Sequence, residues 1–371
     1  MCSFRSALLA ACVVFFLTAF SLGQPRPEFL EAPGFGGLPN AIVFGSGDFN
    51  GDGKLDFVEF GSSGAGVLSL LGKGDGTFRM GKTSPMSQDP NSVGVADFNH
   101  DGKLDIVTAD FQNYVSVMLG NGDGSFQPFV NYPVSTKPQS VAVADFNRDG
   151  NADVVVVDSK WKIVDVLLGN GDGTLQSYYF FSAGAFPTSL VVADLNADQN
   201  PDLVVLNSAV GVNPGNADIV LGNGDGTFQT PTEYLVGQTP IQAAVADFNR
   251  DSRLDIAVAN AADLTCTLLL GNGDGTFQAQ SPIPVSNQPF GMVVGDFNGD
   301  QRLDLVTQLR LGVSLLLGNG DGTFQPEKVY VAGLIDEGVL AGRYNQDAKD
   351  DIAELGGPND GTKNIFVFLG R

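Results

Sequence analysis

An aspartate-rich pattern of nine residues recurs six times along the chain. It reads Asp-x-Asn-x-Asp-x-x-x-Asp, with Phe or Leu second, and its copies begin 48 to 53 residues apart. Calcium takes six to eight oxygen ligands from carboxylates, amides and backbone carbonyls. The pattern therefore predicts a calcium loop that resembles a shortened EF-hand, with side-chain oxygens at positions 1, 3, 5 and 9 and a backbone carbonyl at position 7. The predicted ligands are Asp48, Asn50, Asp52, Lys54 and Asp56; Asp97, Asn99, Asp101, Lys103 and Asp105; Asp145, Asn147, Asp149, Asn151 and Asp153; Asp194, Asn196, Asp198, Asn200 and Asp202; Asp247, Asn249, Asp251, Arg253 and Asp255; Asp296, Asn298, Asp300, Arg302 and Asp304.

The alternative is that these residues only form turns, which Asp, Asn and Gly favour. A turn needs one or two such residues, whereas each copy places three carboxylates within nine positions, where they repel each other without a cation. We therefore expect Ca²⁺ in up to six loops. Binding should be weaker in the last three loops, where position 6 is not glycine but Gln199, Ser252 or Gln301.

A seventh copy of the pattern is degenerate. It begins 47 residues after the sixth, with Arg343 in place of the first aspartate. We expect no calcium there, and we expect the Arg343 cation to replace the metal by pairing with Asp347 or Asp351.

A second motif, Gly-Asn-Gly-Asp-Gly-Thr-Phe with small variations, follows each intact loop. Its last residue always lies 19 residues before the next Asp pattern. Alternating glycines supply the positive φ of a hairpin turn, and an Asp can bond its own backbone. We expect a structural turn whose Phe packs between repeats, with a ligand role for its Asp as the alternative.

These motifs have to be positioned by short strands. Apolar runs such as residues 140–144, 154–157 and 163–168 are separated by Gly, Asn and Asp turns, and each repeat contains four of them. Four strands per repeat and a period near fifty residues predict an all-β, seven-bladed β-propeller of four-stranded blades. Phe29 lies 19 residues before Asp48, so the N-terminal strand should complete the last blade and close the ring. An open β-solenoid is the alternative.

The two motifs together resemble the FG-GAP/VCBS repeat family, which includes the N-terminal propeller of integrin α subunits and many bacterial exported proteins. The resemblance covers residues from about 29 to 371. It implies a seven-bladed propeller with calcium between the first two strands of a blade, and a role in adhesion, carbohydrate binding or larger surface proteins. The literal Phe-Gly…Gly-Ala-Pro signature is largely eroded here, so integrin-like partner binding does not follow.

The N-terminus predicts export. Arg5 precedes an apolar run over residues 7–20, and small residues precede Gln24, which predicts a signal peptide at residues 1–23 and a single propeller at residues 24–371. A membrane anchor, or a lipoprotein modified at Cys12, is the alternative. We expect no membrane span, and the mature chain retains only Cys266, expected as a buried thiol. The net charge of −22 argues against nucleic-acid partners, which need basic patches.

Binding is expected rather than catalysis. The only histidine, His100, stands at a variable loop position where we expect an exposed residue, so a Ser-His-Asp triad is excluded. Four polar residues recur five positions after a closing Asp and could bind sugar hydroxyls, or could only cap turns: Asp110, Asp158, Asn207 and Asn260. Trp161 could stack on a sugar or be half-buried in a blade.

Three ligand hypotheses remain open at this point. The first is an extracellular glycan, the second a protein partner and the third a glycan substrate of a hydrolase or lyase. Stacking aromatic side chains on one face would favour the first, a broad apolar patch the second, and two opposed carboxylates in a cleft the third. The sequence leaves the oligomeric state open, and a monomer fits it.

Overall fold

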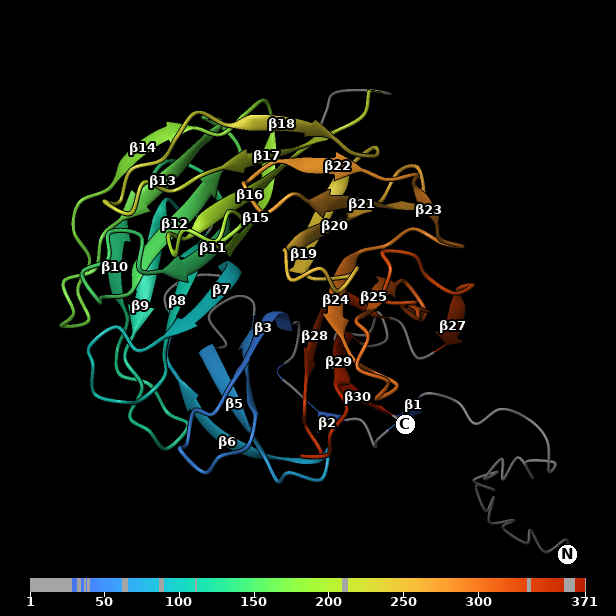
Figure 1. The fold of residues 1–371 in the computed structure, drawn as a ribbon. Coiled ribbons are helices and arrows are strands. Elements are labelled where there is room, and N and C mark those ends of the chain that lie inside the picture. Colours follow the sequence, from blue (N-terminus) through green and yellow to red (C-terminus); the bar gives the residue numbers. More distant parts are fainter. Residues whose placement is uncertain are drawn as a thin grey trace, which may run out of the picture.

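The chain forms seven antiparallel sheets arranged around a central axis (Figure 1). The computed structural model describes residues 29–31, 35–36, 38, 41–61, 66–86, 90–110, 112–208, 213–331, 335–356 and 364–370. Every regular element in these ranges is a β-strand, which confirms the predicted all-β, seven-bladed propeller. The predicted signal peptide lies outside the described residues. No helix in the described ranges has the length and hydrophobicity to cross a membrane.

Each of the first six sheets follows the chain from its innermost to its outermost strand. The first blade contains β3 (Ala41–Gly47), β4 (Asp56–Gly61), β5 (Gly66–Gly72) and β6 (Phe78–Ser84). The second contains β7 (Pro90–Ala96), β8 (Asp105–Asp110), β9 (Tyr114–Met118) and β10 (Val130–Pro133). The third contains β11 (Pro138–Ala144), β12 (Asp153–Asp158), β13 (Ile163–Leu167) and β14 (Tyr179–Ser182). The fourth contains β15 (Pro187–Ala193), β16 (Asp202–Asn207), β17 (Asn216–Val220) and β18 (Thr232–Leu235).

The remaining blades vary in their outer strands. The fifth contains β19 (Pro240–Ala246), β20 (Asp255–Asn260) and β21 (Thr265–Gly271), with β22 (Phe277–Ala279) and β23 (Ile283–Pro284) both pairing with β21. The sixth contains β24 (Gly291–Gly295), β25 (Asp304–Leu309), β26 (Gly312–Leu316) and β27 (Lys328–Val331). The seventh contains β28 (Ile335–Gly342), β29 (Asp351–Gly356) and β30 (Asn364–Gly370).

The seventh sheet takes its outer strands from the other end of the chain. β1 (Phe29–Glu31) pairs antiparallel with β30, with Phe29 opposite Gly370, and β2 (Phe35–Gly36) pairs with the start of β30. Around the axis each innermost strand contacts the next, including β28 with β3. The first and last described strands of the chain therefore share one sheet.

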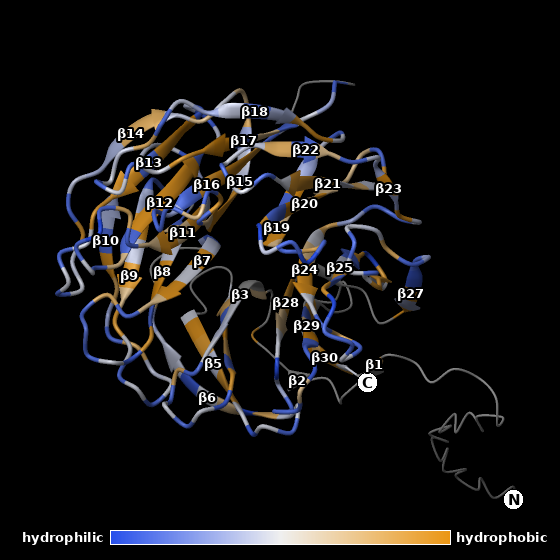
Figure 2. Ribbon diagram, viewed as in Figure 1, coloured by the Kyte–Doolittle hydropathy of each residue, from blue (hydrophilic) through white to orange (hydrophobic). Residues whose placement is uncertain are grey.

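The core consists of apolar layers between neighbouring blades. The second strands of the first six blades are buried along their whole length. Figure 2 colours β12, which contains four consecutive valines, as hydrophobic. Among the described residues, a separate hydrophobic cluster lies between each pair of neighbouring sheets, and one of them joins the first and seventh. Cys266 is buried in one such layer, as predicted.

The strand register defines two faces of the propeller. At one end of each blade the first strand passes into the Asp loop, as where Ala144 pairs with Asp153. At the other end the hairpins between second and third strands lie beside the start of the first strand, since Pro138 pairs with Asp158. We name the first end the Asp-loop face and the second the hairpin face.

Candidate metal loops and ligand-binding face

The closing aspartate of each loop is buried and ties two segments together. In the first loop, Asp56 Oδ2 accepts a hydrogen bond from the Phe49 N–H (3.0 Å), and Oδ1 accepts one from the Gly72 N–H (2.8 Å). The same pair of bonds recurs at Asp105, Asp153, Asp202, Asp255, Asp304 and Asp351. The loop and the Gly-rich turn are thus held against each other by one carboxylate.

The other carboxylates organise the loop backbone. Asp48 accepts hydrogen bonds from the N–H groups of Asp52 (3.1 Å) and Gly53 (2.8 Å), and Asn50 Oδ1 accepts a second bond from Asp52 (2.9 Å). Asp52 Oδ1 accepts one from the Lys54 N–H (3.1 Å). These contacts repeat with nearly the same lengths in all six intact loops.

The loop carboxylates also act on one another electrostatically. Burial raises the pKa of Asp56 to about 6 and that of Asp304 to about 7. The charges at positions 1 and 5 of the same loop raise the pKa further, as Asp48 and Asp52 do for Asp56. The two outer carboxylates thus disfavour the ionisation of the closing one, and a bound cation would relieve this effect.

The residues present fit a hard cation in type. Every predicted donor is an oxygen, and each N–H bond uses only one of the two lone pairs of a carboxylate oxygen. The side chains do not converge as they stand: among the described residues, no three His, Cys, Asp or Glu side chains are gathered as a metal site. The carboxylates are directed to loop N–H groups, so an ion would have to engage the remaining lone pairs.

Position 6 of each intact loop has left-handed backbone. Gln199, Ser252 and Gln301 at this position have φ of 68°, 66° and 64°. The glycines that stand there in the first three loops have similar φ values of 80°, 78° and 86°. The substitutions therefore leave the loop's shape unchanged. The predicted weaker binding of these loops stays a prediction.

Position 4 makes contacts that the sequence did not reveal. Its side chains reach the next loop around the ring: His100 Nε2 lies 2.9 Å from Asn151 Oδ1, Arg148 donates to the Asp198 carbonyl (2.7 Å), and Gln346 donates to the Gly53 carbonyl (3.3 Å). His100 is exposed, as predicted. In the sequence only the variability of position 4 was visible, and variability does not indicate a contact.

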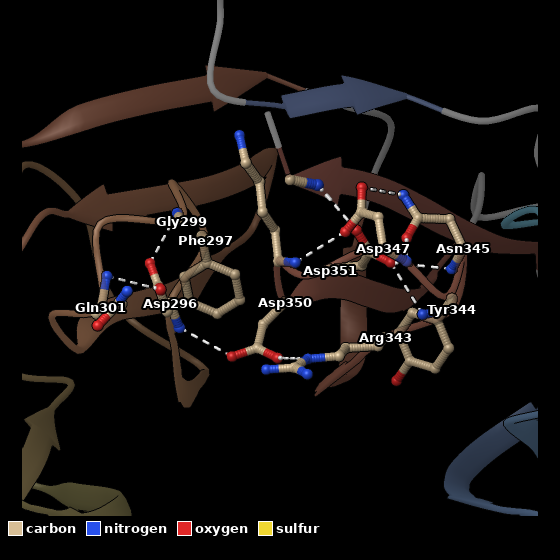
Figure 3. Close-up of polar contacts among 12 residues, drawn as sticks. Asp296, Phe297, Gly299, Gln301, Arg343, Tyr344, Asn345, Asp347, Asp350 and Asp351 are labelled. Carbon is tan, nitrogen blue, oxygen red and sulfur yellow. Dashed lines mark hydrogen bonds and ion pairs between the residues drawn. The ribbon is translucent and has the colours of Figure 1, made fainter.

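In the degenerate seventh loop the arginine pairs with a different residue from those predicted. Arg343 Nε donates to Asp350 Oδ1 (3.2 Å), as Figure 3 shows. Asp351 is occupied by the N–H groups of Tyr344 and Asn345. Asp350 Oδ2 in turn accepts a hydrogen bond from the Asp296 N–H (2.8 Å), so the ion pair links the seventh loop to the sixth. The expected pairing with Asp347 or Asp351 was wrong. Backbone N–H groups bond to Asp351, and Asp347 accepts hydrogen bonds from the Asn345 side chain and the Lys349 N–H.

The Gly-rich turns have the structural role that we expected. Asp75 Oδ1 accepts hydrogen bonds from the N–H (3.0 Å) and the hydroxyl (2.5 Å) of Thr77. The turn's Phe packs on the previous blade, as where the rings of Phe126 and Phe49 lie 5.6 Å apart. A glycine N–H of the turn also donates to the previous loop, from Gly124 to the Phe49 carbonyl (3.0 Å).

The four recurring polar residues are inaccessible to a ligand. Asp110, Asp158, Asn207 and Asn260 are at most 1% exposed. Asp158 accepts the N–H groups of Lys160 (2.8 Å) and Trp161 (2.6 Å) at its hairpin. Their predicted role in sugar binding is contradicted by this burial, and the alternative, that such residues satisfy local structure, accounts for these bonds. Trp161, by contrast, is 59% exposed at the tip of the same hairpin.

The hairpin face has a polar hollow at the central axis. Its volume is about 400 Å³, and its lining comes mostly from the first residues of the innermost strands, which include Asn91, Gln139, Thr188, Ser189 and Gln242. These amides and hydroxyls recur because β7, β11 and β15 each begin with Pro followed by two polar residues, a repeat that is visible in the sequence.

Large side chains are exposed around this hollow. The hairpins and blade connections on the same face expose Tyr114, Trp161, Phe186, Leu264, Phe290 and Leu311. The other large exposed apolar side chains of the described residues belong to the blades' outer strands and the residues next to them. The two faces thus differ sharply, with carboxylates on one and aromatic and amide groups on the other.

The chain belongs to a repeat family that these features define. A family model described as FG-GAP-like repeat matches residues 48–108, 97–156, 145–205, 209–258 and 247–307. The chain is therefore a member of the FG-GAP-like repeat family, as the loop motifs predicted. A comparison with curated proteins gives no significant match.

Solved structures share the fold at low sequence identity. A lectin from Agrocybe aegerita, described as specifically recognising non-reducing terminal N-acetylglucosamine, is 23% identical with a TM-score of 0.57, over 79% of this chain and 80% of the lectin. BBS1N in complex with ARL6DN is 13% identical with a TM-score of 0.66, over 92% and 97%. A protein from Lactobacillus plantarum is 11% identical with a TM-score of 0.58, over 82% and 88%. At these identities the likeness concerns the fold alone.

Proposed function

We propose that this chain is a secreted, calcium-stabilised propeller that binds carbohydrate on its hairpin face and catalyses no reaction. The observation that carries the proposal is the combination of a polar hollow of about 400 Å³ with exposed aromatic side chains around it. Sugars present hydroxyls to amides and apolar ring faces to aromatic side chains. The lectin of similar fold supports this ligand class.

Calcium would act on the opposite face as a source of rigidity. The donors in each intact loop would be the carboxylates at positions 1, 5 and 9, the Asn at position 3 and the carbonyl at position 7. Six ions would change the net charge from −22 to −22 + 12 = −10. At millimolar calcium and dissociation constants of about 10⁻⁴ to 10⁻³ M, each site would contribute about 0.4–1.4 kcal/mol.

A glycan array tests the proposal, with the mature chain applied in millimolar calcium and again in chelator. Specific spots are expected in calcium, and they should weaken in chelator because the blades lose their bound ions. Gln139→Ala should weaken those spots about tenfold, since Gln139 lines the hollow. Gln278→Ala on the exposed outer strand β22 is the matched control and should change nothing. A blank array from protein shown to be folded would overturn the carbohydrate proposal.

A protein partner is the second candidate, and one observation favours it. The sixth blade has a largely apolar hollow of about 390 Å³ lined by Phe290, Leu311, Val329 and Val331 among others. BBS1N, which shares the fold, was solved in a complex with another protein. Retention of a specific protein by the folded chain, together with a blank glycan array, would favour this candidate.

A further inference from the structure

One hairpin and the two neighbouring blade connections on the hairpin face concentrate positive charge and aromatic rings in a chain of net charge −22. We define the lysine–aromatic patch as Lys137, Lys160, Trp161, Lys162 and Phe186, all of which are exposed. The patch lies beside the axial hollow, because Phe186 is followed two residues later by Thr188, which lines that hollow.

The hairpin backbone of the patch is held by a buried carboxylate. Asp158 accepts hydrogen bonds from the N–H groups of Lys160, Trp161 and Lys137 (2.8, 2.6 and 2.9 Å). Asp158 is 1% exposed, and its oxygens are directed to the backbone. It therefore fixes the hairpin without neutralising the ammonium groups that the hairpin presents to solvent.

The lysines are positioned over rings. Lys162 Nζ lies 4.3 Å from the centroid of the Phe186 ring, and Lys160 Nζ lies 5.4 Å from that of Trp161. A cation over an aromatic face is attracted by the ring quadrupole, which restrains a flexible side chain. Two ammonium groups and two ring faces are thus arranged within one short stretch of surface.

These lysines differ from the basic residues of the opposite face. Lys54, Lys103, Arg253 and Arg302 each form an ion pair with the position-5 Asp of their own loop. Within the described ranges, no carboxylate forms an ion pair with Lys160 or Lys162. Their charge is available to a ligand, whereas that of the loop cations is engaged.

Resting on the proposed carbohydrate function, we infer that the ligand is an anionic saccharide bound at the lysine–aromatic patch. A carboxylated pyranose matches it in chemistry, since its ring face stacks on the exposed Trp161 while its carboxylate accepts hydrogen bonds from the lysines. The neighbouring hollow supplies amides and hydroxyls for the sugar's hydroxyl groups. A neutral sugar would leave the two ammonium groups unused.

Binding of an oligogalacturonate and of its methyl ester, measured by calorimetry in calcium, tests this inference. The two ligands share their rings and differ in charge. The acid should bind at least tenfold more tightly than the ester, and added NaCl should weaken only the acid, since screening acts on charge. The double variant Lys160→Gln/Lys162→Gln should lose this preference. Lys73→Gln, an exposed lysine in a Gly-rich turn of the Asp-loop face, is the control and should retain it.

The outcomes separate this inference from the function on which it rests. Equal binding of acid and ester, or an unchanged preference in the double variant, would overturn the anionic ligand while leaving a carbohydrate-binding propeller. Trp161→Ala should weaken both ligands, because stacking does not depend on the carboxylate. Absence of binding to any saccharide would refute the proposed function itself. Tighter binding of a penta-glutamate peptide than of the oligogalacturonate would assign the patch to an acidic protein instead.

Discussion

At the scale of single residues, the closing aspartate has a structural role besides its proposed role as a calcium ligand. Asp153 accepts the Gly169 N–H on Oδ1 (2.7 Å) and the Phe146 N–H on Oδ2 (2.9 Å). Only a carboxylate can accept on both atoms, because an amide presents N–H₂ in place of one oxygen. The same side chain therefore belongs to the fold and to the proposed calcium loop.

Asp153→Asn should consequently destabilise the protein even in chelator. We expect a loss of about 1–3 kcal/mol in the free energy of unfolding, since a buried N–H would face another donor. Calcium should add a further loss of about 0.4–1.4 kcal/mol, the contribution of one site. Urea unfolding measures both. Asp172→Asn in an exposed Gly-rich turn is the matched control, and an equal loss there would contradict the assignment.

Glycines in the two motifs are required for different reasons. A Cβ on Gly72 would lie 2.1 Å from the Leu55 carbonyl oxygen, whereas Gly53 has φ of +80° and no heavy atom within 4 Å of such a Cβ. Gly72→Ala should therefore cost about 3 kcal/mol through a backbone clash, and Gly53→Ala about 1 kcal/mol through left-handed strain. Thermal unfolding of both variants measures the difference, and the reverse order would show that close approach is not the constraint.

At the scale of elements, the short strand β1 has a large packing role. Phe29 is 4% exposed and packs against Phe297, Tyr330 and Phe368, with ring centroids 5.8, 5.2 and 6.3 Å away. Since the strand has only three residues, this aromatic contact rather than its hydrogen bonds should hold it against β30.

Phe29→Ala should lower the free energy of unfolding by about 3–5 kcal/mol, as is typical of a buried Phe. Phe180→Ala is the matched control, because this Phe on the outer strand β14 is 61% exposed and should cost less than about 0.5 kcal/mol. Urea unfolding followed by tyrosine and tryptophan fluorescence compares the two. Similar midpoints for the two variants would mean that β1 contributes little to the seventh blade.

Much of this arrangement could be predicted because it repeats. The seven copies of the Asp pattern indicated seven blades. The constant offset of 19 residues from each Gly-rich turn to the next loop pointed to Phe29 as the equivalent of the turn phenylalanines. Whether a polar side chain is buried or exposed could not be predicted in this way. Asp110 and Asn260 recur at a strand end like surface residues, yet they are buried because neighbouring hairpins and strands cover them. Contacts between loops, such as that of Arg148 with Asp198, depend on the angle between blades, which no single repeat encodes.

At the scale of the whole molecule, many carboxylates are buried without a cation of the protein beside them. Burial raises the pKa of Asp153 and Asp202 to about 6 and that of Asp304 to about 7. It acts likewise on carboxylates away from the loops, raising the pKa of Asp165 to about 6 and that of Asp218 to about 7. Folding thus favours the protonated form of all these groups.

The stability of the metal-free protein should therefore fall as pH rises from about 4 to 7. In this window the folded state binds more protons than the unfolded state, whose carboxyl groups titrate near pH 4, so the free energy of unfolding decreases with pH.

Calcium should reverse part of this loss, because it binds deprotonated carboxylates and releases their protons. The stabilisation by calcium should be small at pH 5 and reach about 2–8 kcal/mol for six sites at pH 7.5. Urea unfolding in about 1 mM calcium and in chelator across this range measures both curves, with magnesium as the control ion. Coincident curves would refute calcium binding at the loops, whereas a gap that widens with pH would tie the ion to the closing aspartates.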